Sequence, residues 1–150
     1  MVTRSVIGVH GVTVGEAAYD VKRAGENITI VTYGLMLHYC LEAAEAVAVE
    51  GIDVEVVDLR TLRPLDKETV LNSVKKTGKL LIVHEDNVTG GVGAEIAALV
   101  ADEAFEYLDG PVTRLCGPDV PTMPFAQTLE DEYMPNTDKI AQALRKQAAY

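Results

Sequence analysis

Hydrophobic and polar positions follow two alternating patterns along the chain from residue 27 onward. Short runs of β-branched and other apolar residues predict strands at residues 28–33, 52–59, 80–83 and 112–116. Between these runs, apolar residues recur at intervals of three and four, which is the spacing of an amphipathic helix. The predicted helices lie at about residues 37–48, 66–76, 91–107 and 137–148.

Capping residues and prolines mark where these elements begin and end. Asp66 is a predicted N-cap of the second helix, and Asn136 or Thr137 is the predicted N-cap of the last one. Gly78 follows the second helix, as glycine commonly does at a helix C-terminus. Three prolines within residues 118–124 predict a loop before the last helix.

The order of these elements predicts one α/β domain. Strands that alternate with helices form a three-layer fold, in which a mostly parallel sheet has helices on both faces. The domain is expected to span residues 15–150, and residues 84–90 are a predicted loop. Residues 6–14 are apolar and glycine-punctuated without a clean period, so only an N-terminal arm of undefined structure is expected at residues 1–14.

Charge and cysteine content narrow the classes of partner and location. The formal net charge is -10, which repels nucleic-acid phosphates and anionic membranes but attracts a basic partner or simply favours solubility. No run of 18 or more apolar residues occurs, so no membrane span is predicted. Cys40 and Cys116 both lie in apolar patterns, which predicts buried free thiols and a reducing, cytoplasmic location.

The most polar candidate cluster follows the third predicted strand. Ligands of open α/β sheets bind at the carboxyl ends of the strands, where His84, Glu85 and Asp86 are expected. An imidazole beside carboxylates suits a general base, but neighbouring residues of an extended chain point to opposite faces. The favoured role is therefore structural, at a strand end or an interface, and neither a metal site nor a catalytic residue is predicted.

A second candidate is an anion site built from glycines and arginines. Gly91 and Gly93 precede or open a predicted helix, whose free N–H groups can hold an anion. Arg60 and Arg63 follow the second predicted strand and are able to clamp a carboxylate or phosphate. The glycine spacing matches neither a dinucleotide fingerprint nor a phosphate loop, so a tight packing turn and structural ion pairs are the favoured roles.

Four sequence strings occur in the order of a known family. They are DLRTLRPLD at residues 58–66, VHED at 83–86 followed by TGGVGAEI at 89–96, CGPDVP at 116–121, and YMPN at 133–136. Together they resemble the C-terminal transketolase-type domain of the beta subunits of thiamine-diphosphate-dependent 2-oxo acid dehydrogenases, of the pyruvate and branched-chain type. The resemblance covers about residues 15–148.

This resemblance implies a non-catalytic part of a larger enzyme. The family decarboxylates a 2-oxo acid on thiamine diphosphate and passes the acyl group to an acyltransferase. The cofactor and its magnesium ion are held by other domains and by the alpha subunit, so this domain alone is expected to bind neither. Its expected partners are the alpha subunit, a second beta subunit in a homodimer, and the basic subunit-binding domain of the acyltransferase.

The same resemblance assigns two docking residues. Residues 105–111 (FEYLDGP) match the place of a docking carboxylate in related beta subunits, which gives that role to Asp109. The carboxylate at Tyr150 is the second expected contact. Two alternatives remain open: a free-standing module that binds a small anion or ligand on the same fold, and the equivalent domain of another transketolase-like enzyme.

Overall fold

A computed structural model describes residues 20–121 and 124–150, and the expected arm at residues 1–14 lies outside them. The strands are β1 (Asp20–Arg23), β2 (Ile28–Thr32), β3 (Val54–Asp58), β4 (Leu80–Asn87) and β5 (Thr113–Gly117). The helices are α1 (Met36–Ala48), α2 (Lys67–Thr77), α3 (Val92–Glu103), the 3-10 helix η1 (Phe105–Tyr107), α4 (Gln127–Tyr133) and α5 (Thr137–Ala148).

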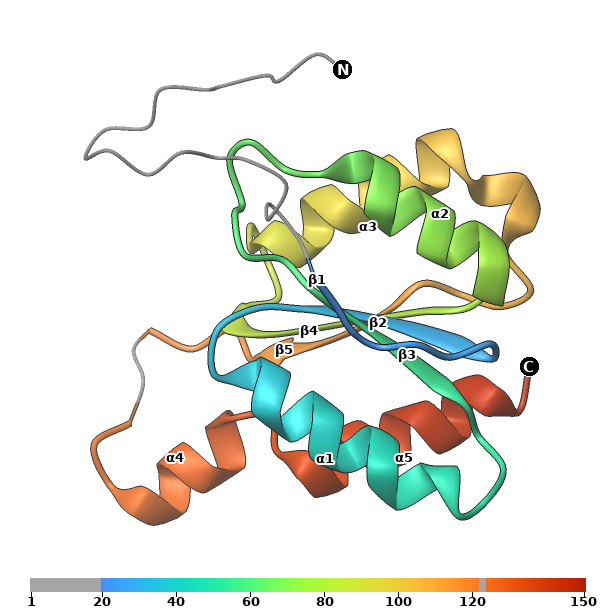
Figure 1. Cartoon of the computed structure of the whole chain (residues 1–150). Coiled ribbons are helices and arrows are strands. Elements are labelled where there is room, and N and C mark those ends of the chain that lie inside the picture. Colours follow the sequence, from blue (N-terminus) through green and yellow to red (C-terminus); the bar gives the residue numbers. More distant parts are fainter. Residues whose placement is uncertain (1–19, 122–123) are drawn as a thin grey trace.

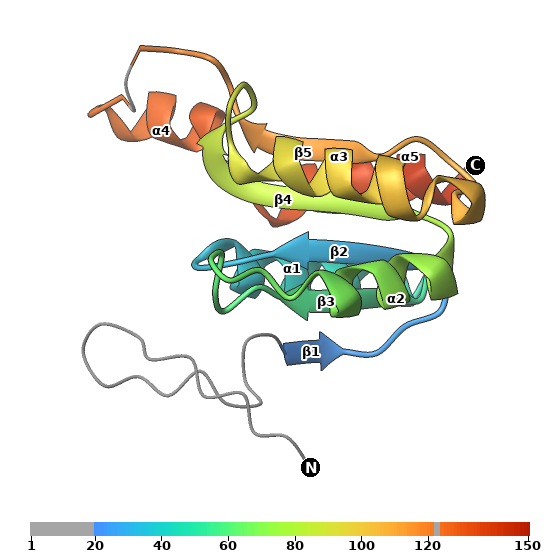
Figure 2. The same cartoon turned by 90° about the horizontal axis from the view of Figure 1, so that it is seen from above.

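The five strands form one sheet in the order β1-β3-β2-β4-β5, which Figure 2 shows from one edge to the other. Strand β2 pairs in parallel with β3 and with β4, and β4 pairs in parallel with β5. Only β1 runs antiparallel within this sheet, at its edge beside β3. The predicted mostly parallel sheet is confirmed.

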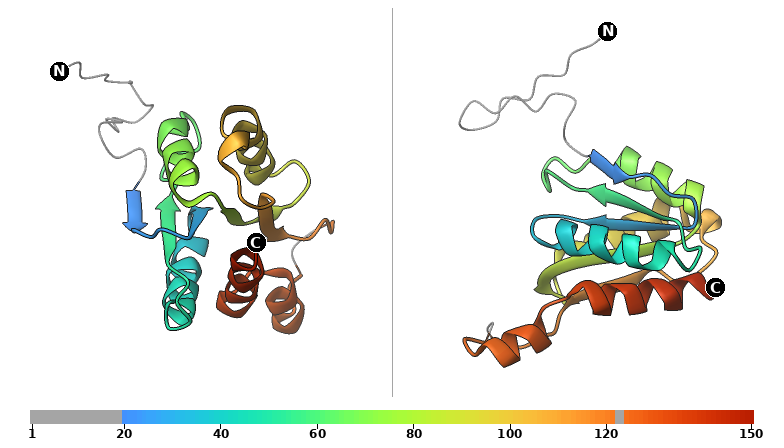
Figure 3. Two further views of the ribbon diagram at one scale, coloured as in Figure 1. Left: turned by 90° about the vertical axis from the view of Figure 1, so that its right-hand side faces the viewer. Right: turned by 60° about the horizontal axis from the view of Figure 1, so that its bottom comes forward.

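Two helices cover each face of the sheet, which confirms the three-layer fold (Figures 1 and 3). Helices α1 and α5 pack on one face, where their core includes Ile30, Cys40 and Leu144. Helices α2 and α3 pack on the other face, around Val31 and Ile96. The two faces are served by alternate residues of the same strand, as the period of two in a strand requires.

The helix ends follow the capping residues of the sequence. The Asp66 carboxylate accepts a hydrogen bond from the Thr69 N–H at 3.0 Å, and Gly78 ends α2 in the left-handed region with φ of 69°. Of the two predicted caps of α5, Asn136 fills the role, and its side-chain oxygen accepts from the Lys139 N–H at 2.9 Å.

Two strands differ from the prediction. Strand β1 lies where the hydrophobic pattern predicts no element, because this polar edge strand exists through pairing with β3 and buries no apolar run of its own. Strand β4 continues to Asn87, so the predicted loop 84–90 is wrong for its first half. Asn87 pairs with Gly117 of β5, which extends the ladder beyond the apolar residues.

Two helical segments also differ. The predicted helix 91–107 ends at Glu103, since Ala104 leaves the helical region with φ of -143° and η1 follows. Helix α4 falls inside the predicted loop, just beyond the prolines. It has no buried residue, so it carries no apolar stripe by which the sequence pattern reveals a helix.

None of the helices in the described part of the chain is both long and apolar enough to cross a membrane.

The N-cap of α2 is open to a direct stability test. Replacing Asp66 by Ala removes the acceptor of the Thr69 N–H and is expected to lower the free energy of unfolding by about 1 kcal/mol. Asp66→Asn keeps a capping oxygen and is expected to stay within about 0.5 kcal/mol of the parent chain. Urea unfolding followed by circular dichroism measures both, and equal stabilities for the two variants would contradict the role of the cap.

Candidate functional site

His84 occupies the centre of the carboxyl end of the sheet and is completely buried. Its Nε2 accepts a hydrogen bond from the Gly93 N–H at 3.1 Å, at the start of α3. The Cys116 Sγ lies 3.2 Å from the same nitrogen, and the Tyr33 ring stacks on the imidazole with centroids 6.0 Å apart. The imidazole therefore connects β4, β5, α3 and the residue that follows β2.

The chemistry of this cluster is that of a neutral hydrogen-bonded core. Burial lowers the pKa of His84, against the opposing effect of Asp86. A second proton on Nε2 would also face the Gly93 N–H, where the ring now accepts. Burial raises the pKa of the Cys116 thiol to about 11, so the Cys116–His84 pair lacks the low thiol pKa of a nucleophilic dyad.

The two acidic residues after His84 do not converge with it. Glu85 and Asp86 are both exposed, whereas His84 points into the core. Among residues 20–121 and 124–150, no three His, Cys, Asp or Glu side chains are placed to hold a metal ion. No chemical step is assigned to Glu85 or Asp86.

The glycines of the expected anion site pack closely against β4. A Cβ added at Gly91 would lie 2.3 Å from the Asn87 carbonyl oxygen, and one added at Gly93 would lie 2.5 Å from the His84 Nε2. Since backbone and a buried ring supply these contacts, both positions need glycine so that α3 can approach the strand. The Gly93 N–H is also already donated to His84.

The arginines of the same predicted site lie on the loop after β3. Arg60 is 3.4 Å from the Asp20 carboxylate and 3.7 Å from that of Asp58, which matches the structural ion pair considered for it. Arg63 is exposed and has no ion-pair partner in the described part of the chain. The geometry thus favours packing and ion pairing here, and the anion site stays a prediction.

Short loops tie the carboxyl ends of β4 and β5 together. The Thr89 N–H and Oγ1 donate to the Asp119 carboxylate at 3.1 and 2.6 Å, and these bonds lower the pKa of Asp119. The Arg114 guanidinium donates to the Val88 carbonyl oxygen at 2.7 Å. The motif residues 83–96 and 116–121, remote in sequence, therefore form one structural unit at this end.

An apolar groove opens beside this unit, between the end of β5 and α4. Its volume is about 440 Å³, and its lining includes Cys116, Val120, Leu129 and Tyr133. Leu129 is 58% exposed, and Phe125 on the neighbouring loop is fully exposed. Apolar side chains gathered on a surface in this way are typical of an interface.

The two predicted docking residues lie at the opposite end of the sheet, where the parallel strands begin. The Asp109 N–H donates to the Gly78 carbonyl oxygen at 2.7 Å, which fixes the backbone of this segment to the end of α2. The Asp109 side chain is exposed, and its carboxylate has no hydrogen-bond or ion-pair partner among residues 20–121 and 124–150. It is therefore free to receive a cation from another molecule.

Helix α5 carries Tyr150 to the same place. The buried Gln147 accepts from the Thr113 hydroxyl at 2.8 Å and donates to the Pro111 carbonyl oxygen at 2.8 Å. A Cβ added at Gly110 would lie 3.1 Å from the Cβ of Tyr150, so the tyrosine rests directly on this glycine. The structure thus places Tyr150 against Gly110, next to Asp109, although Asp109 and Tyr150 are 41 positions apart in the sequence.

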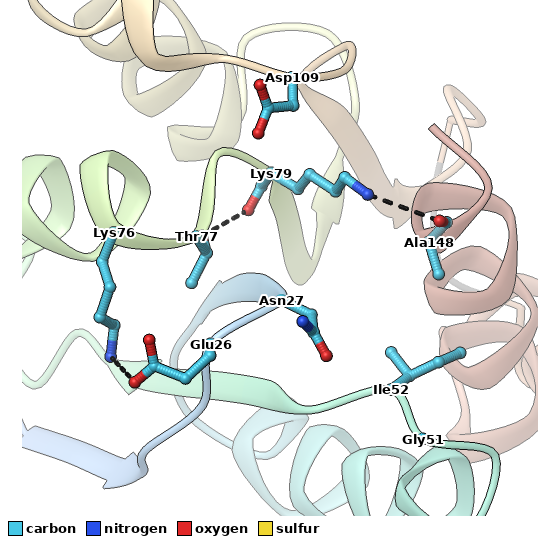
Figure 4. A pocket seen from close by; sticks show the side chains of 9 residues that line it. All are labelled: Glu26, Asn27, Gly51, Ile52, Lys76, Thr77, Lys79, Asp109 and Ala148. Atoms are coloured by element: carbon cyan, nitrogen blue, oxygen red, sulfur yellow. Dashed lines mark hydrogen bonds and ion pairs between the residues drawn. The ribbon is translucent and has the colours of Figure 1, made fainter.

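A polar cavity of about 510 Å³ adjoins these residues (Figure 4). Its lining residues are Glu26, Asn27, Gly51, Ile52, Lys76, Thr77, Lys79, Asp109 and Ala148. Lys76 forms an ion pair with the buried Glu55, and the Lys79 Nζ donates to the Ala148 carbonyl oxygen at 3.5 Å. We call Asp109, Gly110, Tyr150 and this cavity the amino-edge surface.

Sequence reasoning did not identify the residues that shape the amino-edge surface. Gly78 is readable only as a helix cap, because its approach to Asp109 bridges 31 positions. Gln147 lies in a helix whose sequence is largely charged and polar, so nothing in the sequence sets it apart from exposed residues. Its buried side chain is visible only in the structure. No local signal marks the contact between His84 and Cys116.

The three-layer α/β fold, with its sequence motifs joined at one end of the sheet, agrees with the class of transketolase-type C-terminal domains that the motifs resemble. The chain belongs to this family, since the model of the transketolase C-terminal domain matches residues 16–140. A solved structure described as a split gene transketolase, inactive beta4 tetramer, is similar with a TM-score of 0.77 and 30% identity. That likeness covers 87% of this chain and 42% of the other.

Curated relatives narrow the resemblance to beta subunits. The chain is 47% identical over 131 residues to the 2-oxoisovalerate dehydrogenase subunit beta of Bacillus subtilis, covering 87% of this chain and 40% of the relative. It is 48% identical over 135 residues to the mitochondrial pyruvate dehydrogenase E1 component subunit beta of Dictyostelium discoideum, covering 90% and 37%. The chain therefore spans about two fifths of the length of these relatives.

The buried state of His84 predicts a pH dependence of stability. Because burial lowers its pKa below 6.5 in the folded chain, the unfolded chain binds a proton first as the pH falls. The free energy of unfolding should therefore fall below about pH 6.5, and this component should be absent from His84→Gln. Urea unfolding of both chains between pH 5 and 8 tests this, and parallel pH curves would contradict it.

Proposed function

We propose that this chain is the C-terminal assembly and docking domain of a 2-oxo acid dehydrogenase beta subunit, and that it binds the subunit-binding domain of the acyltransferase. The observation that carries the proposal is the exposed, unpaired Asp109 carboxylate, held by its backbone beside Tyr150. Similarity to beta subunits over most of the chain supports the same assignment.

Electrostatics favour a basic docking partner. The chain has a formal net charge of -10, which accelerates encounter with a cationic surface. A carboxylate without an internal ion pair forms a new one with a partner at no cost of breaking an existing one. Asp109 meets this condition, unlike Glu50, which the Arg145 guanidinium contacts at 2.6 Å.

The apolar groove at the carboxyl edge supports the assembly role. Val120, Phe125 and Leu129 are exposed there, on a segment whose helix α4 has no fully buried residue. In the proposed enzyme, the alpha subunit and a second beta subunit would cover such surfaces. Docking and assembly would then use opposite edges of the sheet, so that both occur in one complex.

The proposed parent enzyme performs an oxidative decarboxylation, which this domain supports without catalysing it. Thiamine diphosphate and magnesium would supply the chemistry on other parts of the enzyme. The residues of this chain have structural tasks instead: His84 joins the strands, and Asp109 and Tyr150 present the docking surface.

Calorimetric titration with the acyltransferase subunit-binding domain from the same organism tests the docking role. Asp109→Ala should weaken binding by about 1–3 kcal/mol, the scale for losing a charged hydrogen-bond partner. Binding by the parent chain should also weaken with added salt. Glu132→Ala removes the same charge from α4 at the opposite edge, and its affinity should equal that of the parent chain.

The same titration separates this proposal from a free-standing ligand-binding module. A well-folded chain that ignores the subunit-binding domain contradicts docking. A stable monomer whose melting temperature rises with inorganic phosphate would instead favour an anion-binding module at the Gly90–Gly93 turn with Arg60 or Arg63.

A further inference from the structure

Gly78 lies directly against the side chain of Asp109. A Cβ added at Gly78 would be 2.3 Å from the Asp109 Oδ2 and 2.9 Å from its Cγ, both far inside van der Waals contact. Gly78 is itself buried, at the point where α2 ends. The exposed carboxylate of Asp109 thus occupies the space that a side chain at position 78 would fill.

The segment that carries Asp109 is also attached to the end of α2 at two points. The Asp109 N–H donates to the Gly78 carbonyl oxygen at 2.7 Å. One turn earlier in the helix, the Lys75 Nζ lies 5.2 Å from the centre of the Tyr107 ring, in a cation–π contact. These links hold residues 107–109 in place, so the remaining freedom of Asp109 lies in its side chain.

A methyl group at position 78 would displace the carboxylate and spare the fold. The atoms it would strike first belong to the free end of an exposed side chain, which rotates at little cost. The nearest backbone atom, the Tyr107 carbonyl oxygen, would be 3.3 Å away, a tight contact that small shifts relieve. The consequence of this substitution falls on where Asp109 points.

We propose, on the basis of the docking function above, that Gly78 is the positioning residue of the docking carboxylate. By having no side chain, Gly78 lets the Asp109 carboxylate lie back over the end of α2. In this position the carboxylate is exposed as part of the amino-edge surface, where a cationic side chain of the partner is able to reach it. Gly78 makes no contact with the partner in this proposal and acts only through Asp109.

The chain contains a matched control for the strain of this substitution. Gly78 has φ of 69° and Gly34 has φ of 62°, so alanine at either position adopts the same unfavourable backbone conformation. A Cβ at Gly34 would meet nothing within 4 Å. Gly34→Ala therefore reproduces the strain of Gly78→Ala without displacing Asp109.

Calorimetric titration of the full 150-residue chain with the subunit-binding domain compares these variants. Gly78→Ala should weaken docking about five-fold or more, and Gly34→Ala less than about two-fold, at similar losses in melting temperature. In the Asp109→Ala background, Gly78→Ala should change the affinity by less than about two-fold. Equal weakening by the two glycine variants, or an undiminished effect without Asp109, would overturn the positioning role.

The same set of variants separates the two proposals. If the well-folded parent chain does not bind the subunit-binding domain, the docking function itself fails. If the parent chain binds but Asp109→Ala leaves the affinity unchanged, Asp109 is not the docking carboxylate and the role of Gly78 fails with it. If Asp109→Ala weakens docking but Gly78→Ala does not exceed Gly34→Ala, only the positioning role fails. Should Gly78→Ala be too unstable to measure, Asp109→Ala in the same chain should restore folding by removing the struck atoms, and a double variant that stays unfolded would refute the steric relation.

Discussion

Strand β2 is hydrogen-bonded on both sides, to β3 and to β4, and every one of its residues is buried. A buried parallel strand of this kind leaves no polar backbone group to solvent, so its two neighbours must be in register. Strand β3 lies on one side of β2, and β4 lies on the other. The chain therefore crosses the sheet in opposite directions in its first two connections, and the connecting helices α1 and α2 lie on opposite faces. The three layers follow from this pairing, and so does the gathering of loops at the two ends of the parallel strands.

The two ends of the parallel strands are built differently, and the difference has a physical reason. At the carboxyl edge, the side chains of neighbouring strands converge, and His84 fills the junction as a neutral acceptor for the Gly93 N–H. Burial lowers the pKa of His84 and raises that of Cys116, so it favours the neutral form of both groups.

The amino edge is built from helix ends and the loops that join them to strands. The end of α2 holds Asp109 through Gly78, and the end of α5 is fastened by Gln147 to Pro111 and Thr113. These bonds fix the backbone while leaving the Asp109 carboxylate exposed. In the proposed docking role, a rigid base under an unpaired charge would reduce the free energy that a partner spends on ordering it.

The sequence by itself determined the elements whose apolar residues face the core, and with them the α/β class and the caps at Asp66 and Gly78. Its motif strings also indicated the family, because they identify particular residues, whereas hydrophobic periodicity identifies only helices and strands. Two elements depend on the tertiary structure and have no local hydrophobic pattern. Strand β1 forms by pairing with β3, and helix α4 has no fully buried residue. Tertiary structure also decided which distant residues meet, Gly78 with Asp109 and His84 with Cys116, since packing of the helices on the sheet sets such distances.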